Sequence, residues 1–369
     1  MNRIKSAFPI LQSLAGYNLG LFKWDLIAGL TLASFILPES MAYASLAGLP
    51  SQYGIYCCII GGLFFALFTS SRQLAVGPTS AISLMVGTSA AMLSGGDPVK
   101  WMAIASLTSL TVFLLCIVAY FLKLSVVVNF IGDNILLGFK TGAALSIAST
   151  QFPKLLGIEG NGNNFIERIY TLLTHIQDTN LTILIFGIAA LVILVWLNKR
   201  FPGRPLALLI VIVSLLVITA IPFFSSVIPL VGDIPAGLPR FSIPSFRFVD
   251  MEGIFELAIG CFLIGYIETT SAARTIAEKH GADVDPRQEL LSMGAANLAV
   301  SFVGGYPVSG GLSQSTINDK AGAKTSFSLI ICSFVLIVIL LLFTGVLRNL
   351  PEVILTVIVL DAISGLIKI

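Results

Sequence analysis

Small hydroxyl residues and glycines interrupt two long apolar segments of the chain. Residues 72–83 read RQLAVGPTSAIS, and residues 306–316 read YPVSGGLSQST. Because proline lacks an amide proton and glycine weakens helices, each stretch predicts a short extended run followed by the start of a helix. The free N–H groups and positive dipole end of such a start favour an anion, with no basic side chain required. The residues predicted to bind an anion there are Thr79, Ser80, Gly311, Leu312 and Ser313.

A turn at the membrane surface is the alternative interpretation of either stretch taken alone. However, each stretch follows an apolar segment that carries a carboxylate, Glu39 in LPESMAYA and Glu268 in IGYIETTSAA. The two glutamates lie 229 residues apart, and Thr79 and Ser313 lie 234 apart, which indicates an internal repeat. About seven spans separate the copies, and this odd number predicts opposite orientations in the membrane. Broken helices at matching positions of inverted repeats point to the binding site of a transporter.

The two glutamates are candidates for coupling and for binding. An ionised carboxylate is costly in hydrocarbon, so an intramembrane glutamate usually faces a cavity. We predict that Glu268, which is followed directly by Thr269, takes up a proton as an anion binds nearby. The alternative for Glu268 is a structural carboxylate bonded to a neighbouring helix. Glu39 follows Pro38, which kinks its segment, and a position facing the pore is expected for it.

The composition is that of a multi-spanning helical membrane protein. Of the 369 residues, 56% are hydrophobic and 11% are charged, against roughly 25% charged residues in soluble domains. Several apolar runs approach the ~20 residues that cross a bilayer. The polar connection at 223–250 is rich in Pro and Gly, which predicts an extended linker. About twelve spans are expected, near residues 25–46, 54–70, 77–93, 101–122, 127–150, 181–198, 205–222, 253–272, 288–303, 309–320, 326–347 and 353–369.

The distribution of basic residues predicts the orientation of these spans. With the N-terminus in the cytoplasm, 14 Lys and Arg residues fall on the cytoplasmic side and 6 on the far side. Because cytoplasmic loops carry an excess of Lys and Arg, this split favours a cytoplasmic N-terminus. Residues 1–24 lack a cleavable signal pattern and are interpreted as a cytoplasmic or interfacial segment.

The sequence gives no indication of enzymatic, redox or nucleic-acid chemistry. The five cysteines lie in apolar segments without metal-ligand or disulfide spacing and are interpreted as packing residues. The basic residues are scattered rather than clustered, which argues against a nucleic-acid partner. No nucleophile–base constellation, Walker motif or metal spacing is present, so neither an enzyme nor a metal site is expected.

Three ordered motifs resemble those of the sulfate permease (SulP) family: GLTLASFILPESMAYASLAGLPSQYGIY, SRQLAVGPTSAISLMVG and AEKHGADVDPRQELLSMGAANLAVSFVGGYPVSGGLSQSTINDKAGAKT. The resemblance covers nearly the whole chain. It implies an all-α polytopic membrane protein with a UraA-like fold, in which seven plus seven inverted-repeat spans form a core and a gate domain. Spans 3 and 10 are the broken helices, the anion lies between their N-termini, and the core moves like an elevator. Carried over by motif, the anion site comprises Glu39, Tyr43, Thr79, Ser80, Leu312 and Ser313, and Glu268 takes the acidic position associated with proton coupling.

The resemblance also implies a division of the chain. The expected parts are the N-terminal segment 1–24, core ranges 25–125 and 251–325, gate ranges 126–222 and 326–369, and an extracytoplasmic linker 223–250. The second gate range is expected to be incomplete, with about two of the family's fourteen spans and its STAS domain not contained in the sequence.

Two residues depart from the family pattern. Many members have Gln where this chain has Glu39, and a second acid would repel a dianion unless it is protonated. Many members have Arg directly after the serine of span ten, where this chain has Gln314. The missing fixed charge leaves helix dipoles and proton uptake to offset the charge of the anion, which favours symport.

We therefore expect a secondary active transporter that couples sulfate, or a similar small inorganic anion, to protons in the inner membrane of a bacterium. No cofactor is expected beyond the coupling ion, and a homodimer is implied by the resemblance. One alternative is a bicarbonate or dicarboxylate carrier, with Na⁺ as the coupling ion. A nucleobase permease of the same architecture fits the motifs less well. An anion channel or a non-transporting membrane scaffold is the alternative from a different class.

Overall fold

The computed structural model describes residues 8–11, 16–123, 133–158, 160, 165–201, 204, 206–235, 237–246 and 251–364. Helices dominate these ranges, and the two strands are each two residues long. Parts of the predicted N-terminal segment and linker lie outside the described residues, as does the side chain of Lys140.

The helices follow the predicted order of spans. The first half contains α3 (Leu19–Leu46), α4 (Gln52–Phe68), β1 (Val76–Gly77), α5 (Ser80–Ser94), α6 (Pro98–Phe121), α7 (Asp133–Leu156), α9 (Leu181–Arg200) and α10 (Leu206–Ala220). The second half contains α12 (Met251–His280), α13 (Pro286–Ser301), β2 (Ser309–Gly310), α14 (Leu312–Lys320), α15 (Phe327–Leu342), α16 (Thr344–Leu347) and α17 (Glu352–Ser364).

Among the described helices, α3, α6, α9 and α12 are long and apolar enough to cross a membrane by themselves. Four shorter helices, α4, α5, α10 and α15, are also apolar. The prediction of an all-α architecture with broken third and tenth spans is confirmed, because a short strand precedes both α5 and α14.

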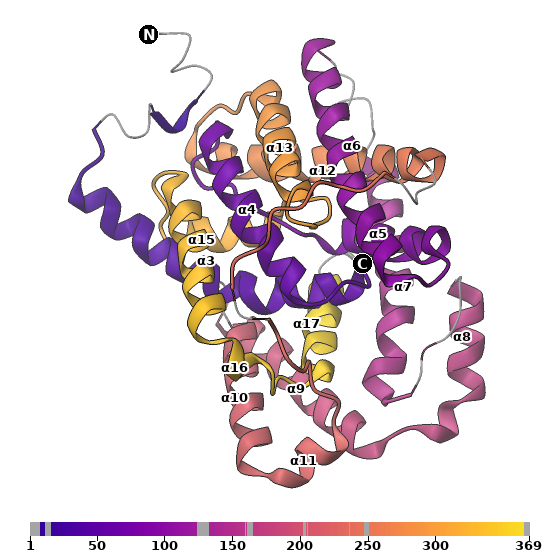
Figure 1. Ribbon diagram of the computed structural model, residues 1–369. Coiled ribbons are helices and arrows are strands. Elements are labelled where there is room, and N and C mark those ends of the chain that lie inside the picture. The colour runs from indigo at the N-terminus through magenta and orange to yellow at the C-terminus, as the bar shows by residue number, and fades with distance from the viewer. Residues whose placement is uncertain are drawn as a thin grey trace.

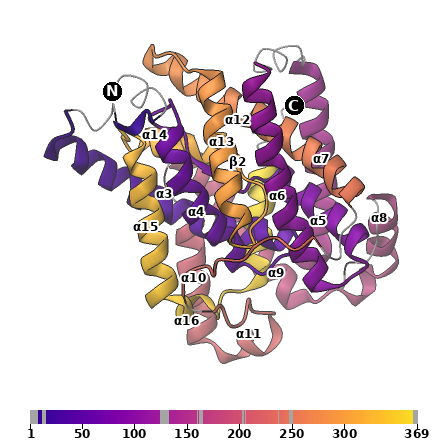
Figure 2. The same ribbon diagram turned by 45° about the horizontal axis from the view of Figure 1, so that its top comes forward.

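Sequence-distant helices form the centre of the bundle. Helix α13 packs against α4 and α6, and α15 packs against α3 and α4, so helices of the second half lie beside helices of the first (Figures 1 and 2). Helix α12 lies against α5, α6 and β2. Helices α9, α10 and α16 lie together at the lower end of Figure 1, away from α12 and α13.

The connections contain more structure than the sequence indicated. The polar connection at 151–180 includes α8 (Phe165–Thr174) and a short 3₁₀ helix, η2 (Ile176–Asp178). The linker begins with α11 (Pro222–Val227), so it is not extended throughout. Beyond α11 it bonds to the second half, since Val231 N donates to Leu350 O at 2.9 Å and Ser242 N donates to Phe302 O at 2.7 Å.

The crossing of α3 and α4 requires a glycine. A Cβ atom on Gly54 would lie 1.9 Å from the carbonyl oxygen of Ser40. Pro38 lies two residues before Ser40, inside α3, and it removes one backbone N–H from that helix. Glu39 lies between the two, so the packing of α4 at Gly54 helps to fix where Glu39 sits.

We expect Gly54→Ala to destabilise the protein, because the added methyl group meets backbone that cannot rotate away. Overpacking of this kind costs roughly 1–3 kcal/mol. The control is Gly142→Ala in α7, where a Cβ would meet nothing within 4 Å. Both changes bring the same gain in helix propensity. The difference between the stabilities of the two variants therefore reports the cost of overpacking at Gly54. Thermal unfolding of the detergent-solubilised protein measures it, and equal melting temperatures would contradict the close crossing.

Candidate functional site

The two interrupted segments meet in an antiparallel ladder. Val76 pairs with Gly310, and Gly77 pairs with Ser309. The ladder continues for one more bond, since Gly311 N donates to Ala75 O at 3.1 Å. Helices α5 and α14 therefore begin near opposite ends of one short ladder, although their first residues are 232 positions apart in sequence.

Neither helix start has a side-chain cap. The N-cap residues are Thr79 for α5 and Gly311 for α14, and neither makes a capping bond through its side chain. The first N–H groups of an α-helix have no partner within the helix. Two helix starts with their positive dipole ends thus lie close to one buried ladder, which is the arrangement predicted from the two glycine-rich stretches.

Glu268 on α12 contacts both broken segments. Its Oε2 atom accepts a hydrogen bond from Thr79 Oγ1 at 2.9 Å and another from Ser309 Oγ at 3.0 Å. The glutamate is partly buried, whereas the next residue, Thr269, is fully buried. One carboxylate therefore holds the hydroxyl in front of α5 and a hydroxyl of β2 at the same time.

Thr269 fixes the backbone of the second broken segment. Its Oγ1 atom accepts from Gly310 N at 2.8 Å and donates to Gly265 O at 2.6 Å. The predicted role of Thr269 was coupling, beside Glu268, and its contact in the structure is with the backbone. The N–H of Gly311 is used in the ladder, so this glycine contributes the shape of the turn rather than an N–H group aimed at a ligand.

Glu39 on α3 is 4% exposed and contacts the second broken segment through Gln314. Tyr43 Oη donates to Glu39 Oε1 at 3.1 Å, and Gln314 Nε2 donates to Glu39 Oε2 at 3.0 Å. The same Nε2 lies 3.3 Å from Pro78 O, directly before α5. Gln314 Oε1 is buried and accepts no hydrogen bond in the described part of the chain. The first turn of α14 is thus joined to α3 and to the residue before Thr79 by one amide side chain.

The exposed side of this arrangement lies at α14. Leu312 is 47% exposed and Ser313 is also exposed, whereas Thr79 and Ser80 are each 8% exposed.

The structure joins four of the nine predicted site residues in two pairs. It brings Thr79 to Glu268 and Tyr43 to Glu39. Two contacts were not predicted, namely Ser309 with Glu268 and Gln314 with Glu39. Both residues lie in the stretch 306–316 that the sequence singled out, but only the pairing of the strands shows which glutamate each one meets.

A buried amide supports the segment before β2. Asn297 on α13 is fully buried, accepts from Val308 N at 3.0 Å and donates to Val308 O at 2.9 Å. It satisfies the backbone of an extended residue that cannot reach water. Non-helical backbone at membrane depth is tolerated only where such partners or a cavity exist. In the described ranges, no three His, Cys, Asp or Glu side chains come together as metal ligands.

The fold and the paired broken helices define the class of protein as a multi-pass membrane protein with the architecture of anion transporters. The architecture matches the structure of SLC26A9 with a TM-score of 0.89 at 22% identity, covering 99% of this chain and 61% of that one. It matches the transmembrane domain of a cyanobacterial bicarbonate transporter, BicA, with a TM-score of 0.88 at 22% identity, covering 95% and 91%. The predicted fold is thereby confirmed.

The chain belongs to the sulfate permease family, whose model matches residues 22–369. A probable sulfate transporter of Mycobacterium tuberculosis is 28% identical over 327 residues, which cover 89% of this chain and 58% of the relative. Sulfate transporter 2.2 of Arabidopsis thaliana is 32% identical over 386 residues, covering 99% and 56%. The chain spans a little over half the length of these relatives. Membership in a family of permeases confirms both the predicted family and the prediction of a transporter class rather than an enzyme.

We expect Thr269→Val to loosen the ladder, because Gly310 N–H would lose its acceptor while staying buried. An unsatisfied buried donor costs about 1–3 kcal/mol. Hydrogen–deuterium exchange of the segment around Gly310 should become faster, by the ratio of rates to which this free-energy cost corresponds. The control is Thr270→Val, since that hydroxyl donates to Tyr266 O within α12 and not to the ladder. Unchanged exchange at Gly310 in Thr269→Val would contradict the bracing role.

Proposed function

We propose that this protein is a secondary active transporter that couples the movement of sulfate, or of a similar small oxyanion, to protons. The observation that carries the proposal is the pair of uncapped helix starts, α5 and α14, held at one buried ladder beside two glutamates. The sulfate transporters among its relatives support this substrate class.

A comparison of charges favours proton coupling. Each helix N-terminus is equivalent to roughly half an elementary charge. The two together offer about one positive charge, against the two negative charges of sulfate. The position after Ser313 is the neutral Gln314, so the residue there adds no cation. Proton uptake by a nearby carboxylate is then the available means of offsetting the rest, and Glu268 and Glu39 are the carboxylates in place.

Glu268 is the better candidate for the coupling residue. It is the more accessible of the two glutamates, and it accepts hydrogen bonds from the hydroxyl groups of both broken segments. Protonation would remove an acceptor position from this carboxylate and leave Thr79 and Ser309 free to turn toward an anion. The proton and the anion would thus be linked through the same two hydroxyl groups.

Sodium-coupled transport of bicarbonate or a dicarboxylate is the second candidate. The observation that favours it is the cluster of hard oxygen atoms formed by Glu268, Thr79 and Ser309, which suits an alkali cation as well as a proton. One structural neighbour is described as a bicarbonate transporter, and this likeness concerns the fold.

The remaining features of the proposal come from the resemblance and the charge distribution. The core ranges 25–125 and 251–325 would move as an elevator against the gate ranges 126–222 and 326–369. The N-terminus would lie in the cytoplasm, in a bacterial inner membrane, and the protein would work as a homodimer. The number and exposure of the apolar helices support the membrane location.

We expect Ser313→Glu to remove sulfate binding at the broken helices, because it puts a negative charge in the exposed first turn of α14, where the anion would be held. Equilibrium binding of radiolabelled sulfate to the purified protein measures the loss. Ser225→Glu on the exposed helix α11 is the matched control and should bind normally. Undiminished affinity in Ser313→Glu would place the transport site elsewhere.

We expect Glu268→Gln to lose proton-driven uptake in proteoliposomes while retaining sulfate–sulfate exchange. The amide cannot be ionised, yet it can still accept from Thr79 and Ser309. Glu256→Gln, at an exposed position on the same helix, is the control and should keep the pH dependence. Uptake that follows a Na⁺ gradient instead would favour the second candidate. Anion current without any dependence on pH would indicate a channel, and wild-type uptake in Glu268→Gln would exclude this residue from coupling.

A further inference from the structure

A polar cavity is lined by residues of three loops and by none of the residues at the starts of α5 and α14. It has a volume of about 550 Å³. Its walls come from the loop between α4 and β1, from the end of α12 with the loop that follows, and from the loop between α14 and α15. These three loops connect spans on one face, which the distribution of basic residues predicts to be cytoplasmic. We name it the loop cavity, and its lining residues are Ser70, Ser71, Arg72, Gln73, Ala277, His280, Ala282, Asp283, Val284 and Lys324.

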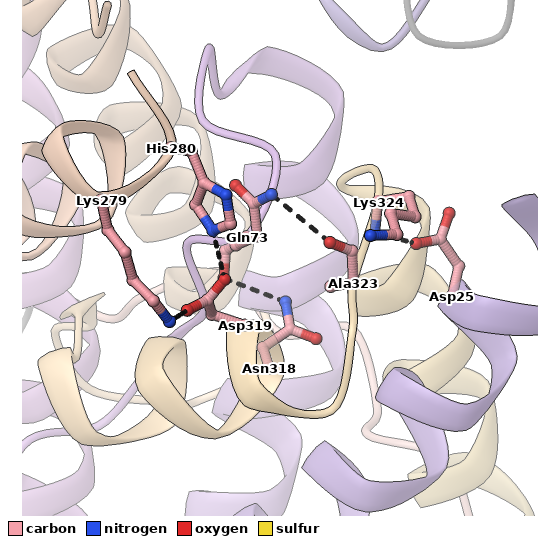
Figure 3. A network of polar contacts seen from close by, with 8 residues as sticks. All are labelled: Asp25, Gln73, Lys279, His280, Asn318, Asp319, Ala323 and Lys324. Atoms are coloured by element: carbon pink, nitrogen blue, oxygen red, sulfur yellow. Dashed lines mark hydrogen bonds and ion pairs between the residues drawn. The ribbon is translucent and has the colours of Figure 1, made fainter. Parts of the chain in front are cut away.

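The lining of the loop cavity is mostly neutral, with a small excess of basic over acidic side chains. It contains Arg72, Lys324 and His280, and its one carboxylate is that of Asp283. The neighbouring carboxylate of Asp319 is already paired with Lys279 and His280 (Figure 3). Arg72 is exposed and makes no hydrogen bond or ion pair in the described part of the chain. The loop cavity therefore offers a guanidinium for an anion, with a second cationic side chain at Lys324.

A buried carboxylate holds the backbone that carries Arg72. Glu289 on α13 is fully buried, and it accepts from Ser70 N at 2.9 Å, from Ser70 Oγ at 2.7 Å and from Ser71 N at 3.3 Å. Arg72 follows these two serines directly. The loop in front of β1 is thus fixed before any ligand arrives, so little ordering of this loop is needed on binding.

A second buried carboxylate does the same for Lys324. Asp25 on α3 is fully buried and accepts from Lys324 N at 2.7 Å and from Thr325 N at 3.0 Å. The ammonium group of Lys324 lies 5.9 Å from the centre of the Trp24 ring, within the range of a cation–π contact. The two loops are also joined to each other, since Gln73 Nε2 donates to Ala323 O at 3.3 Å and Asn318 Nδ2 donates to Gln73 O at 2.9 Å (Figure 3).

We infer that the loop cavity is a second anion site, which binds a sulfate or phosphate oxyanion between Arg72 and Lys324, separately from the site at the broken helices. A guanidinium offers two parallel N–H groups to such an oxyanion, and an ammonium adds a point charge. Glu289 and Asp25 hold the backbone that carries these two side chains before a ligand binds. The inference concerns binding alone and does not depend on the proposed transport reaction.

The occupant comes from one of two sources with the same chemistry. One is a free oxyanion in the aqueous phase, and the other is the phosphate of an anionic lipid, because juxtamembrane basic residues attract anionic headgroups. Both would use the same two basic side chains. They differ in whether added anionic lipid displaces the free ion.

Equilibrium binding of radiolabelled sulfate at low ionic strength tests the site. The wild-type protein should bind at two sites per chain. The double variant Arg72→Gln/Lys324→Gln should retain one site, Ser313→Glu should retain one, and the combined triple variant should retain none. The double variant Lys199→Gln/Lys320→Gln removes two exposed basic side chains that do not line the cavity, and it should keep both sites.

The outcomes separate the two proposals. The loop-cavity site would be overturned if Arg72→Gln/Lys324→Gln still bound sulfate at two sites per chain. It would also be overturned if the Lys199→Gln/Lys320→Gln control lost one of its two sites. If Ser313→Glu keeps two sulfate sites and Arg72→Gln/Lys324→Gln loses one, the result supports the loop-cavity site. The same result rejects the proposed site at the broken helices. In nanodiscs, loss of the Arg72-dependent site when phosphatidylglycerol replaces phosphatidylcholine identifies a lipid phosphate as the occupant. Retention of that site identifies the free oxyanion.

Discussion

The structure depends on the rule that a backbone polar group inside a bilayer needs a partner or a cavity. Two glycine-containing segments break their helices, and each would leave several such groups unpaired if it were alone. The segments satisfy each other through the ladder of β1 with β2, and Thr269 and Asn297 take up N–H groups on either side of it. Once the extended residues are paired, the unpaired groups that remain are those at the starts of α5 and α14. The proposed anion site therefore lies at the two helix starts that stay uncapped after the extended residues have paired.

The chemistry around the ladder is polar but has little fixed positive charge in its contacts. Glu39 is held by a phenol and an amide, and the contacts of Gln314 reach both α3 and the residue before Thr79. A fixed cation at position 314 would neutralise an anion permanently and would also pair with Glu39. With the neutral Gln314 there, the proposed coupling would rest on the protonation of the carboxylates.

The spans, the two breaks and the glutamates were predictable from sequence because each is a local feature. Apolar length gives a span, glycine and proline give a break, and a lone carboxylate in an apolar segment stands out. The contacts of Ser309 and Gln314 were not predictable, because they depend on the register of strands more than 230 residues apart. The linker was expected to be extended, and α11 forms there because Pro222 at the first turn starts a helix. The bracing carboxylates Asp25 and Glu289 carry no local signal that separates them from ordinary charges near helix ends.

The contacts of the two glutamates cross the boundary between the repeats. Glu39 belongs to the first repeat and accepts from Gln314 of the second, whereas Glu268 belongs to the second and accepts from Thr79 of the first. Each carboxylate also accepts from its own repeat, through Tyr43 and Ser309. A proton on Glu268 would therefore weaken its bonds to both broken segments, and a proton on Glu39 would weaken its bond to Gln314 of α14. Either proton would also change the charge of the site. Binding of an anion at the helix starts and uptake of a proton would then act on the same contacts, so coupling needs no separate relay between distant sites.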